Sequence, residues 1–335
     1  MARFRAVRAG EPHRRGLRRR GGQRLAYIAW ALSGYLVRRL WQSILVLFAV
    51  SVLSFVLIFL SGDPVAVLVP LNARPEDMDN VRHAYNLDQP IPIQYVLFLQ
   101  QAAHGDLGDS FRYHSPALPL VLGRLPITLL LAAASILLIA AVSIPLGVFA
   151  ATHEGGISDG LTTVGSLLAV SMPSFWLGVI LILVFAGTMR ALPASGAGTW
   201  QQLLLPTLTI SAFGIGLLTR LVRRSVAETL RQPFVTTARG KGLGERAIAW
   251  GHVLRNSAIP VVTVMGLQLG ALVGGSVVVE TVFAWPGVGW LMIQSIEARD
   301  LPVIRAAVLV LAGFIVVINL VVDLAYTMLD PRIRL

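Results

Sequence analysis

The sequence of 335 residues has no cysteine, a single lysine and few charged residues. Without cysteine the chain cannot form disulfides, thiolate metal sites or a cysteine nucleophile. The lysine, Lys241, is followed by Gly242 and lies outside any G-x-x-x-x-G-K-[ST] pattern, so the chain has no P-loop to hold ATP. No H-E-x-x-H occurs, which removes the ligands of a zinc-type membrane protease. These absences predict a protein that is not an enzyme and that binds no cofactor or metal itself.

Charged residues make up only 13% of the chain, whereas hydrophobic residues make up 55%. A soluble protein needs more polar surface than this composition provides, so we predict an integral membrane protein. The formal net charge of +11 fits either nucleic-acid binding or membrane topology. Because the basic residues lie where an anionic cytoplasmic leaflet would attract them, we favour a membrane-lipid partner and predict no nucleic-acid partner.

Long apolar runs indicate six transmembrane helices. Each run has at least about 20 residues, which at about 1.5 Å per residue is enough to cross a hydrocarbon core of about 30 Å. The third run is interrupted around Pro173. We therefore predict an all-α polytopic membrane protein whose six helices lie within residues 41–60, 127–151, 161–188, 203–222, 257–283 and 303–328.

The N-terminal region is strongly basic. Residues 1–40 contain eleven arginines and one acid, and no hydrophobic core can form there. We predict that residues 1–34 are a disordered cytoplasmic tail, although an acid-poor, arginine-rich stretch also fits a transit peptide. The first transmembrane helix is expected within residues 35–61, with the N-terminus on the cytoplasmic side by the positive-inside rule.

The next region has the opposite charge. Residues 62–124 contain seven acids and four arginines, which predicts an extracytoplasmic cap, and short helices are expected over 75–85 and 93–103. Residues 125–335 then form a core with the other five transmembrane helices. Six crossings return the C-terminus to the cytoplasm.

A basic loop between two apolar runs, residues 232–260, is the most distinctive part of the chain. Residues 220–256 contain eight basic residues and two acids, which predicts a cytoplasmic position. A short helix is expected over 234–241, and it ends at Gly242-Leu243-Gly244 because glycine disfavours helix and adopts positive φ. A second helix begins at Glu245, an acid suited to a helix N-terminus. We predict a helix-turn-helix at the membrane surface.

Two acids and an asparagine within the predicted spans are candidates for a functional role. Glu280 is near the outer end of the fifth span, and Asn319 and Asp323 are in the inner half of the sixth. A charge in the bilayer is costly unless it is paired or faces water. These residues therefore either line a substrate or ion path or form hydrogen bonds between helices. We favour hydrogen bonding, because isolated acids lack the relay expected of a proton pump.

Prolines occur within three of the spans, at Pro145, Pro173 and Pro206. Broken backbone is tolerated in a membrane where it lines a polar cavity, and a proline can equally produce a simple packing kink. The sequence does not favour one alternative over the other. Pro173 and the adjacent Ser174 are therefore candidates for a translocation path or interface.

Several short strings carry a family resemblance. Residues 234–243 read FVTTARGKGL, residues 252–256 read HVLRN, and residues 278–287 read VVETVFAWPG. Shorter strings are GDP at 62–64, LDQP at 87–90, GDLG at 105–108, PSFW at 173–176, LPASG at 192–196 and LDPRIR at 329–334. In this order they resemble importer-type ABC permeases of the oligopeptide/dipeptide/nickel class, in particular the B-type dipeptide subunits. The resemblance extends from about Tyr35 to the end.

The resemblance implies a type I ABC importer permease in a prokaryotic plasma membrane, with both termini cytoplasmic. It implies that the chain forms half of a translocation path together with a homologous second permease. Two ATPase subunits would hold ATP and Mg, and an extracytoplasmic solute-binding protein would deliver the solute. The positions that match the ATPase-coupling motif are Phe234, Thr236, Thr237, Ala238, Arg239, Gly240, Lys241, Gly242 and Leu243.

Two departures from the family pattern are modest. Gly240 stands where the class usually has alanine, which loosens the first coupling helix by up to about 1 kcal/mol. Asn86 replaces a usual glycine, and asparagine accepts left-handed geometry better than most residues do. Neither change alters the functional expectation.

The resemblance implies di- or oligopeptides as the main substrate class. Nickel complexes, glutathione, opines and sugars stay open, because selection is implied to lie with the separate binding protein. A different class of function is an ATP-independent secondary transporter or channel, which would be expected to show repeat halves or a chain of intramembrane ionisable groups. An intramembrane enzyme is disfavoured because every histidine falls in a predicted tail or loop.

Overall fold

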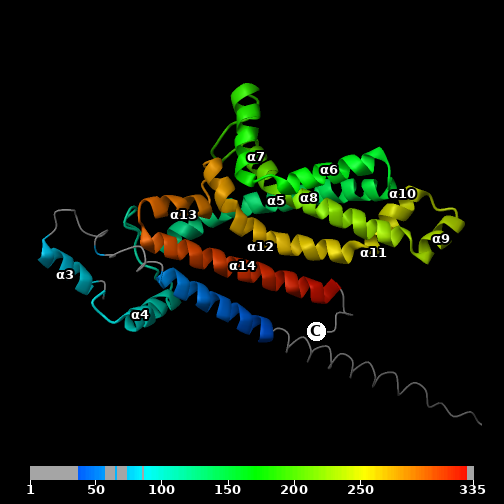
Figure 1. The fold of residues 1–335 in the computed structure, drawn as a ribbon. Coiled ribbons are helices and arrows are strands. Elements are labelled where there is room, and N and C mark those ends of the chain that lie inside the picture. Colours follow the sequence, from blue (N-terminus) through cyan, green and yellow to red (C-terminus); the bar gives the residue numbers. More distant parts are fainter. Residues whose placement is uncertain (1–36, 57–64, 66–73, 85–86, 330–335) are drawn as a thin grey trace, which may run out of the picture.

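The structure is a computed structural model that describes residues 37–56, 65, 74–84 and 87–329. All elements in these ranges are helical (Figure 1). Some sequence-based predictions fall outside the described residues: the disordered tail at 1–34, the end of the first transmembrane segment at 57–61, the GDP string at 62–64 and the C-terminal residues 330–335.

Five helices in the described part of the chain are long and apolar enough to cross a membrane, and a pair of helices joined at a break makes a sixth candidate. The five are Val37–Val56, α5 (Ala117–Thr152), α8 (Trp200–Leu230), α12 (Ala258–Val282) and α14 (Leu301–Leu329). The broken pair is α6 (Ile157–Ser171) with α7 (Ser174–Leu181) and the π-helix η1 (Ile182–Thr188). This arrangement agrees with the predicted six-span, all-α fold when the pair counts as one span.

The longest helix is α5, and it differs from its predicted extent. It begins at Ala117, so residues 117–124, which we expected in the cap, form the start of this helix. It also continues through Pro145 without a break. Close packing supports this stretch: a Cβ on Gly147 would lie 2.6 Å from Cβ of Val222 on α8. Gly147 thus allows the two helices to approach at van der Waals distance just beyond the proline.

The predicted interruption near Pro173 is a sharp bend. Met172 has an extended backbone (φ −80°, ψ 126°), as expected for a residue before proline. The helices on the two sides of the break are inclined at 104°, and α7 stands out from the bundle in Figure 1. Gly178 allows α7 to cross the bundle closely, because a Cβ there would lie 3.2 Å from Phe283 Cε2.

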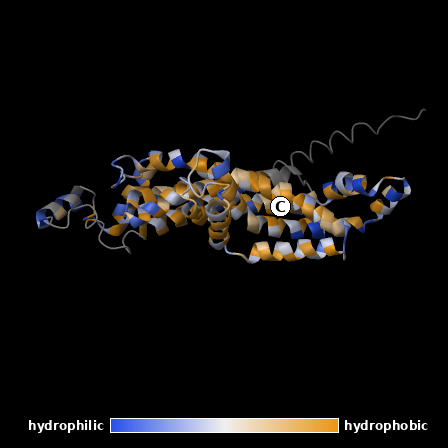
Figure 2. Ribbon diagram, turned by 90° about the horizontal axis from the view of Figure 1, so that it is seen from above, coloured by the Kyte–Doolittle hydropathy of each residue, from blue (hydrophilic) through white to orange (hydrophobic). Residues whose placement is uncertain are grey.

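Helices α5, α8 and α12 form the centre of the bundle. Ile139 of α5 is fully buried, and its side chain packs where Gly214 leaves space on α8. Figure 2 shows hydrophilic residues gathered at the two ends of the bundle, with hydrophobic residues along the length between them. This distribution is that of a bundle surrounded by lipid.

The two ends of the bundle carry different short helices (Figure 1). At one end, called the cap end here, lie α3 (Pro75–Ala84), α4 (Ile91–Ala103) and α13 (Val288–Glu297). At the other, called the knob end, lie α9 (Pro233–Gly240), α10 (Glu245–Ala247), the π-helix η2 (Ile248–Val253) and α11 (Leu254–Asn256). The helices predicted over 75–85, 93–103 and 234–241 are therefore confirmed to within about two residues.

Candidate functional site

The knob-end loop is closed by a defined helix terminus. Gly242 follows α9 with φ +81°, in the left-handed region that favours glycine. Its N–H donates to the carbonyl of Arg239 (2.9 Å), and the N–H of Leu243 donates to the carbonyl of Ala238 (3.3 Å). These two bonds form a Schellman motif, which satisfies carbonyls that the helix end would otherwise leave unpaired. The predicted turn at Gly242 thus has a specific structural cause.

A bidentate ion pair bridges the turn. Nε and Nη2 of Arg239 donate to the two carboxylate oxygens of Glu245, at 2.7 and 3.0 Å. The hydrogen bond from Arg239 lowers the pKa of the Glu245 carboxyl below its ordinary value, and the same bond raises the pKa of Arg239. Arg239 was predicted as a coupling residue, and in the structure its side chain bridges α9 and α10.

The two faces of α9 differ in exposure. Val235 (0% exposed) and Ala238 (9% exposed) pack against the bundle. The other predicted coupling residues are exposed: Phe234, Thr236, Thr237, Arg239, Gly240, Lys241, Gly242 and Leu243. An acidic substitution at Ala238 would therefore disturb packing inside the chain rather than a contact of the exposed face.

Two further ion pairs fix the knob end. Arg223 on α8 donates to both carboxylate oxygens of Asp159 at the start of α6, with Nη2 2.7 Å from Oδ2. Arg231, at the end of α8, donates from Nη2 to both oxygens of Glu154 at 3.0 Å. Both acids belong to the turn between α5 and α6 or directly follow it. The short helices α9 to α11, called the knob here, thus follow α8, a helix whose end forms ion pairs with its neighbours.

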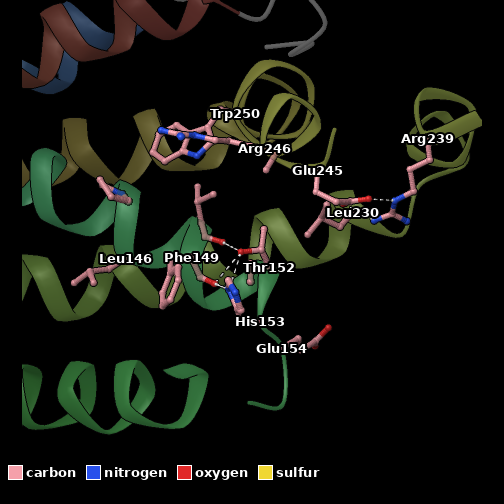
Figure 3. Close-up of a pocket in the computed structure, with 14 residues that line it drawn as sticks. Leu146, Phe149, Thr152, His153, Glu154, Leu230, Arg239, Glu245, Arg246 and Trp250 are labelled. Carbon is pink, nitrogen blue, oxygen red and sulfur yellow. Dashed lines mark hydrogen bonds and ion pairs between the residues drawn. The ribbon is translucent and has the colours of Figure 1, made fainter. Parts of the chain in front are cut away.

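A groove of about 1000 Å³ separates the end of α5 from α10 and η2 (Figure 3). Leu146, Phe149 and Thr152 line it from α5, and Arg246 and Trp250 line it from the opposite wall. The Arg239–Glu245 pair lies at its rim in the same view. The groove and the exposed face of α9 are adjacent features of the knob end.

At the cap end, Glu280 is the centre of a buried polar cluster. Its side chain is 0% exposed. Oε1 accepts hydrogen bonds from Thr128 Oγ1 (2.8 Å) and Ser276 Oγ (3.1 Å), and Oε2 accepts from the N–H of Trp290 (3.0 Å). The carboxylate therefore joins α5, α12 and α13. Gly287 leaves space for the Glu280 carboxylate, because a Cβ on residue 287 would lie 2.5 Å from Oε2 of Glu280.

The five residues predicted for a path or interface do not come together. Pro173 and Ser174 are at the α6–α7 bend, whereas Glu280 is buried in the cap-end cluster. Asn319 on α14 faces α12, where its Oδ1 would be 3.2 Å from a Cβ on Gly270. Asp323 pairs with Arg39 of the first span, with Oδ2 3.1 Å from Nε. The structure places these residues at separate parts of the bundle.

Asp300 is a structural residue that we did not select from the sequence. It precedes α14, is fully buried, and accepts hydrogen bonds from Ser110 Oγ, from the N–H of Phe111 (3.1 Å) and from the N–H of Arg112 (3.3 Å). It thereby anchors the loop before α5 to the start of α14. The one available signal is its position directly before an apolar helix with proline at its second residue, which is typical of a helix start.

Arg305, one turn into α14, was also not selected. Its guanidinium carbon lies 4.4 Å from the ring centroid of Phe98 on α4 and 5.8 Å from that of Phe55 in the first span. Such cation–π contacts strengthen when water is excluded. Arg305 and Asp300 together attach the cap-end helix α4 and the loop 108–116 to one transmembrane helix.

The fold and the clamped knob define a polytopic membrane protein of the transport-permease kind, and comparisons with known proteins identify the family. The description "Binding-protein-dependent transport system inner membrane component" matches residues 143–335, and its N-terminal counterpart matches residues 32–132. The chain belongs to this family and is the permease subunit of a binding-protein-dependent ABC importer in the inner membrane.

Individual relatives agree with this assignment. The chain is 39% identical over 301 residues to the glutathione transport system permease protein GsiC of Escherichia coli O6:H1, covering 90% of this chain and 98% of the relative. It is 36% identical over 316 residues to a Brucella abortus (strain 2308) protein named as a permease of a peptide transport system, covering 90% and 99%. The inward-facing MetNI methionine ABC transporter shares the fold, with a TM-score of 0.54, 17% identity, and coverage of 63% of this chain and 96% of that chain.

Proposed function

We propose that the chain forms half of a translocation path for small peptides and couples it to ATPase subunits through the exposed face of α9. The observation that carries the proposal is the knob: a short helix, capped by a Schellman motif and braced by Arg239–Glu245, on the end of the clamped helix α8. A rigid projection can transmit displacement, whereas a flexible loop would absorb it.

In this proposal the knob end is cytoplasmic and the cap end extracytoplasmic. The excess of basic residues around the knob and of acids in the cap supports that orientation. ATP and Mg are held by two partner ATPase subunits, because the chain lacks a P-loop of its own. A homologous second permease completes the path, and a solute-binding protein meets the cap end.

The position of the translocation path is inferred from the α6–α7 bend. Ser171 and Pro173 are exposed in the single chain, and the bend occurs within a span. Backbone without helical hydrogen bonds is tolerated at membrane depth only where protein or water covers it. We therefore infer that the bend faces the second permease or the aqueous path between the two permease subunits. Glu280, in contrast, joins three helices through buried hydrogen bonds.

The proposed substrates are di- and oligopeptides, including glutathione. The names of the relatives from Escherichia coli and Brucella abortus support this class. Titrating the cognate solute-binding protein with dipeptides, longer peptides and glutathione tests it. Tight binding of a nickel complex or a sugar, with no peptide bound, would replace the proposed substrate.

The coupling role is tested by a pair of proline variants. Gly242→Pro conflicts with φ +81° and removes the N–H that bonds to Arg239, whereas Gly244 has φ −69°, which proline adopts. We expect Gly242→Pro to insert in the membrane but to abolish uptake, and Gly244→Pro to retain uptake. Normal uptake and normal ATPase association by Gly242→Pro would disprove the coupling assignment.

A further inference from the structure

The knob-end groove has an apolar wall that the chain leaves open. Leu146 and Phe149 on α5 are 41% and 48% exposed, and Trp250 across the groove is 45% exposed. The apolar part of α5 ends here, where Thr152, His153 and Glu154 follow. Such a change from apolar to polar residues, with an aromatic side chain beside it, marks the level where a bilayer meets water.

The charges at the groove leave one cation without a partner. Of the ionic side chains that line it, Glu154 pairs with Arg231, and Arg239 pairs with Glu245. Arg246 also lines the groove, and within the described part of the chain it forms no ion pair. The groove therefore combines an apolar wall with one uncompensated guanidinium, a group that binds phosphate through two parallel hydrogen bonds.

The volume suits an occupant larger than a single ion. About 1000 Å³ is in the range of sites for whole small molecules, whereas a single phosphate would leave most of the groove empty. An amphiphile with an anionic head fits both the charge and the apolar wall. Basic pockets between helices at a membrane surface recognise anionic lipid headgroups by the same combination.

We propose that this groove is a binding site for an anionic phospholipid. Its phosphate is bound by Arg246, and the upper part of an acyl chain lies along Leu146, Phe149 and Trp250. The site requires only that the knob end lies at a membrane surface, so it is independent of the coupling role of α9. Its occupancy would brace α10 and η2 against α5, because no ion pair joins them to α5 among the described residues.

Native mass spectrometry of the full-length chain, purified with the subunits it assembles with, tests the site. Phosphatidylglycerol and phosphatidylcholine with identical acyl chains are added separately. We expect preferential retention of phosphatidylglycerol, and Arg246→Gln should weaken it about fivefold, as for the loss of one basic contact at a membrane surface. Arg255→Gln is the matched control, because Arg255 is also exposed and lies outside the groove; it should retain the lipid.

Two further measurements separate the contribution of the charge to lipid binding from that of the apolar wall. Arg246→Lys keeps the charge and should retain most of the preference, which shows that the chain with a changed residue 246 still folds. Glycerol phosphate without acyl chains should not displace the lipid, because the apolar wall contributes to binding. Equal retention of the two lipids, equal loss in Arg246→Gln and Arg255→Gln, or displacement by glycerol phosphate would overturn the proposal. A protein segment filling the groove would give the first of these results.

Discussion

At the residue scale, two glycines of the knob have opposite roles. Gly240 is within α9 and Gly242 follows it with φ +81°, and a Cβ on either would meet no atom within 4 Å. Alanine substitutions at the two positions therefore differ only in the backbone conformation that the alanine must adopt. Gly240→Ala should stabilise α9 by up to about 1 kcal/mol, whereas Gly242→Ala should destabilise its end by about 1–2 kcal/mol. Amide hydrogen exchange over residues 233–243 measures both effects, and a shift in the same direction for both variants would contradict the Schellman assignment.

The buried carboxylate of Glu280 gives a second prediction at this scale. Three donors converge on its two oxygens, so Glu280→Gln places an amide NH₂ against at least one of them. Leaving one buried donor unpaired costs about 1–3 kcal/mol. Thermal unfolding in detergent should therefore occur at a lower temperature for Glu280→Gln than for Glu297→Gln, an exposed acid on the adjacent helix. Equal midpoints would show that the cluster contributes little to stability.

At the element scale, the sequence predicted the elements whose signals are local. The six spans follow from apolar length, and the turn at Gly242 follows from glycine chemistry. The start of α5 at Ala117 did not follow from the sequence. Neither did the continuity of that helix through Pro145, which is followed by close packing of Gly147 against α8. The angle of the α6–α7 bend was likewise not predictable, since Pro173 indicates a break but not its direction.

Asp300 illustrates the same limit for the site. Its three partners lie nearly 190 residues earlier in the chain, so no local pattern could pair them. Asp300→Asn leaves one acceptor oxygen for three donors, and we expect amide exchange at residues 110–113 to accelerate about tenfold. Asp109→Asn, an exposed neighbour of that loop, is the control. If both variants exchange alike, the loop is held by its own turn and not by α14.

At the scale of the whole molecule, the orientation of the bundle is a prediction that rests on charge. Because the sequence contains no cysteine, single cysteines report their position without background. Tyr113→Cys at the cap end should react with a membrane-impermeant maleimide in intact cells, after permeabilisation of any outer membrane. Thr237→Cys at the knob should react only once the inner membrane is opened. The reverse pattern would invert the topology and remove the basis for an ATPase contact at α9.

The central claim is that the exposed face of α9 meets an ATPase subunit, and site-specific cross-linking tests it most directly. In membranes containing the assembled transporter, a photoactivatable cross-linker on Thr237→Cys should join the chain to an ATPase subunit, and the same group on Tyr113→Cys should not. Thr237 is exposed, as are Phe234 at the start of α9 and Leu243 beyond its end, so these side chains are available for the contact. An ATPase adduct from Tyr113→Cys, with none from Thr237→Cys, would contradict the account.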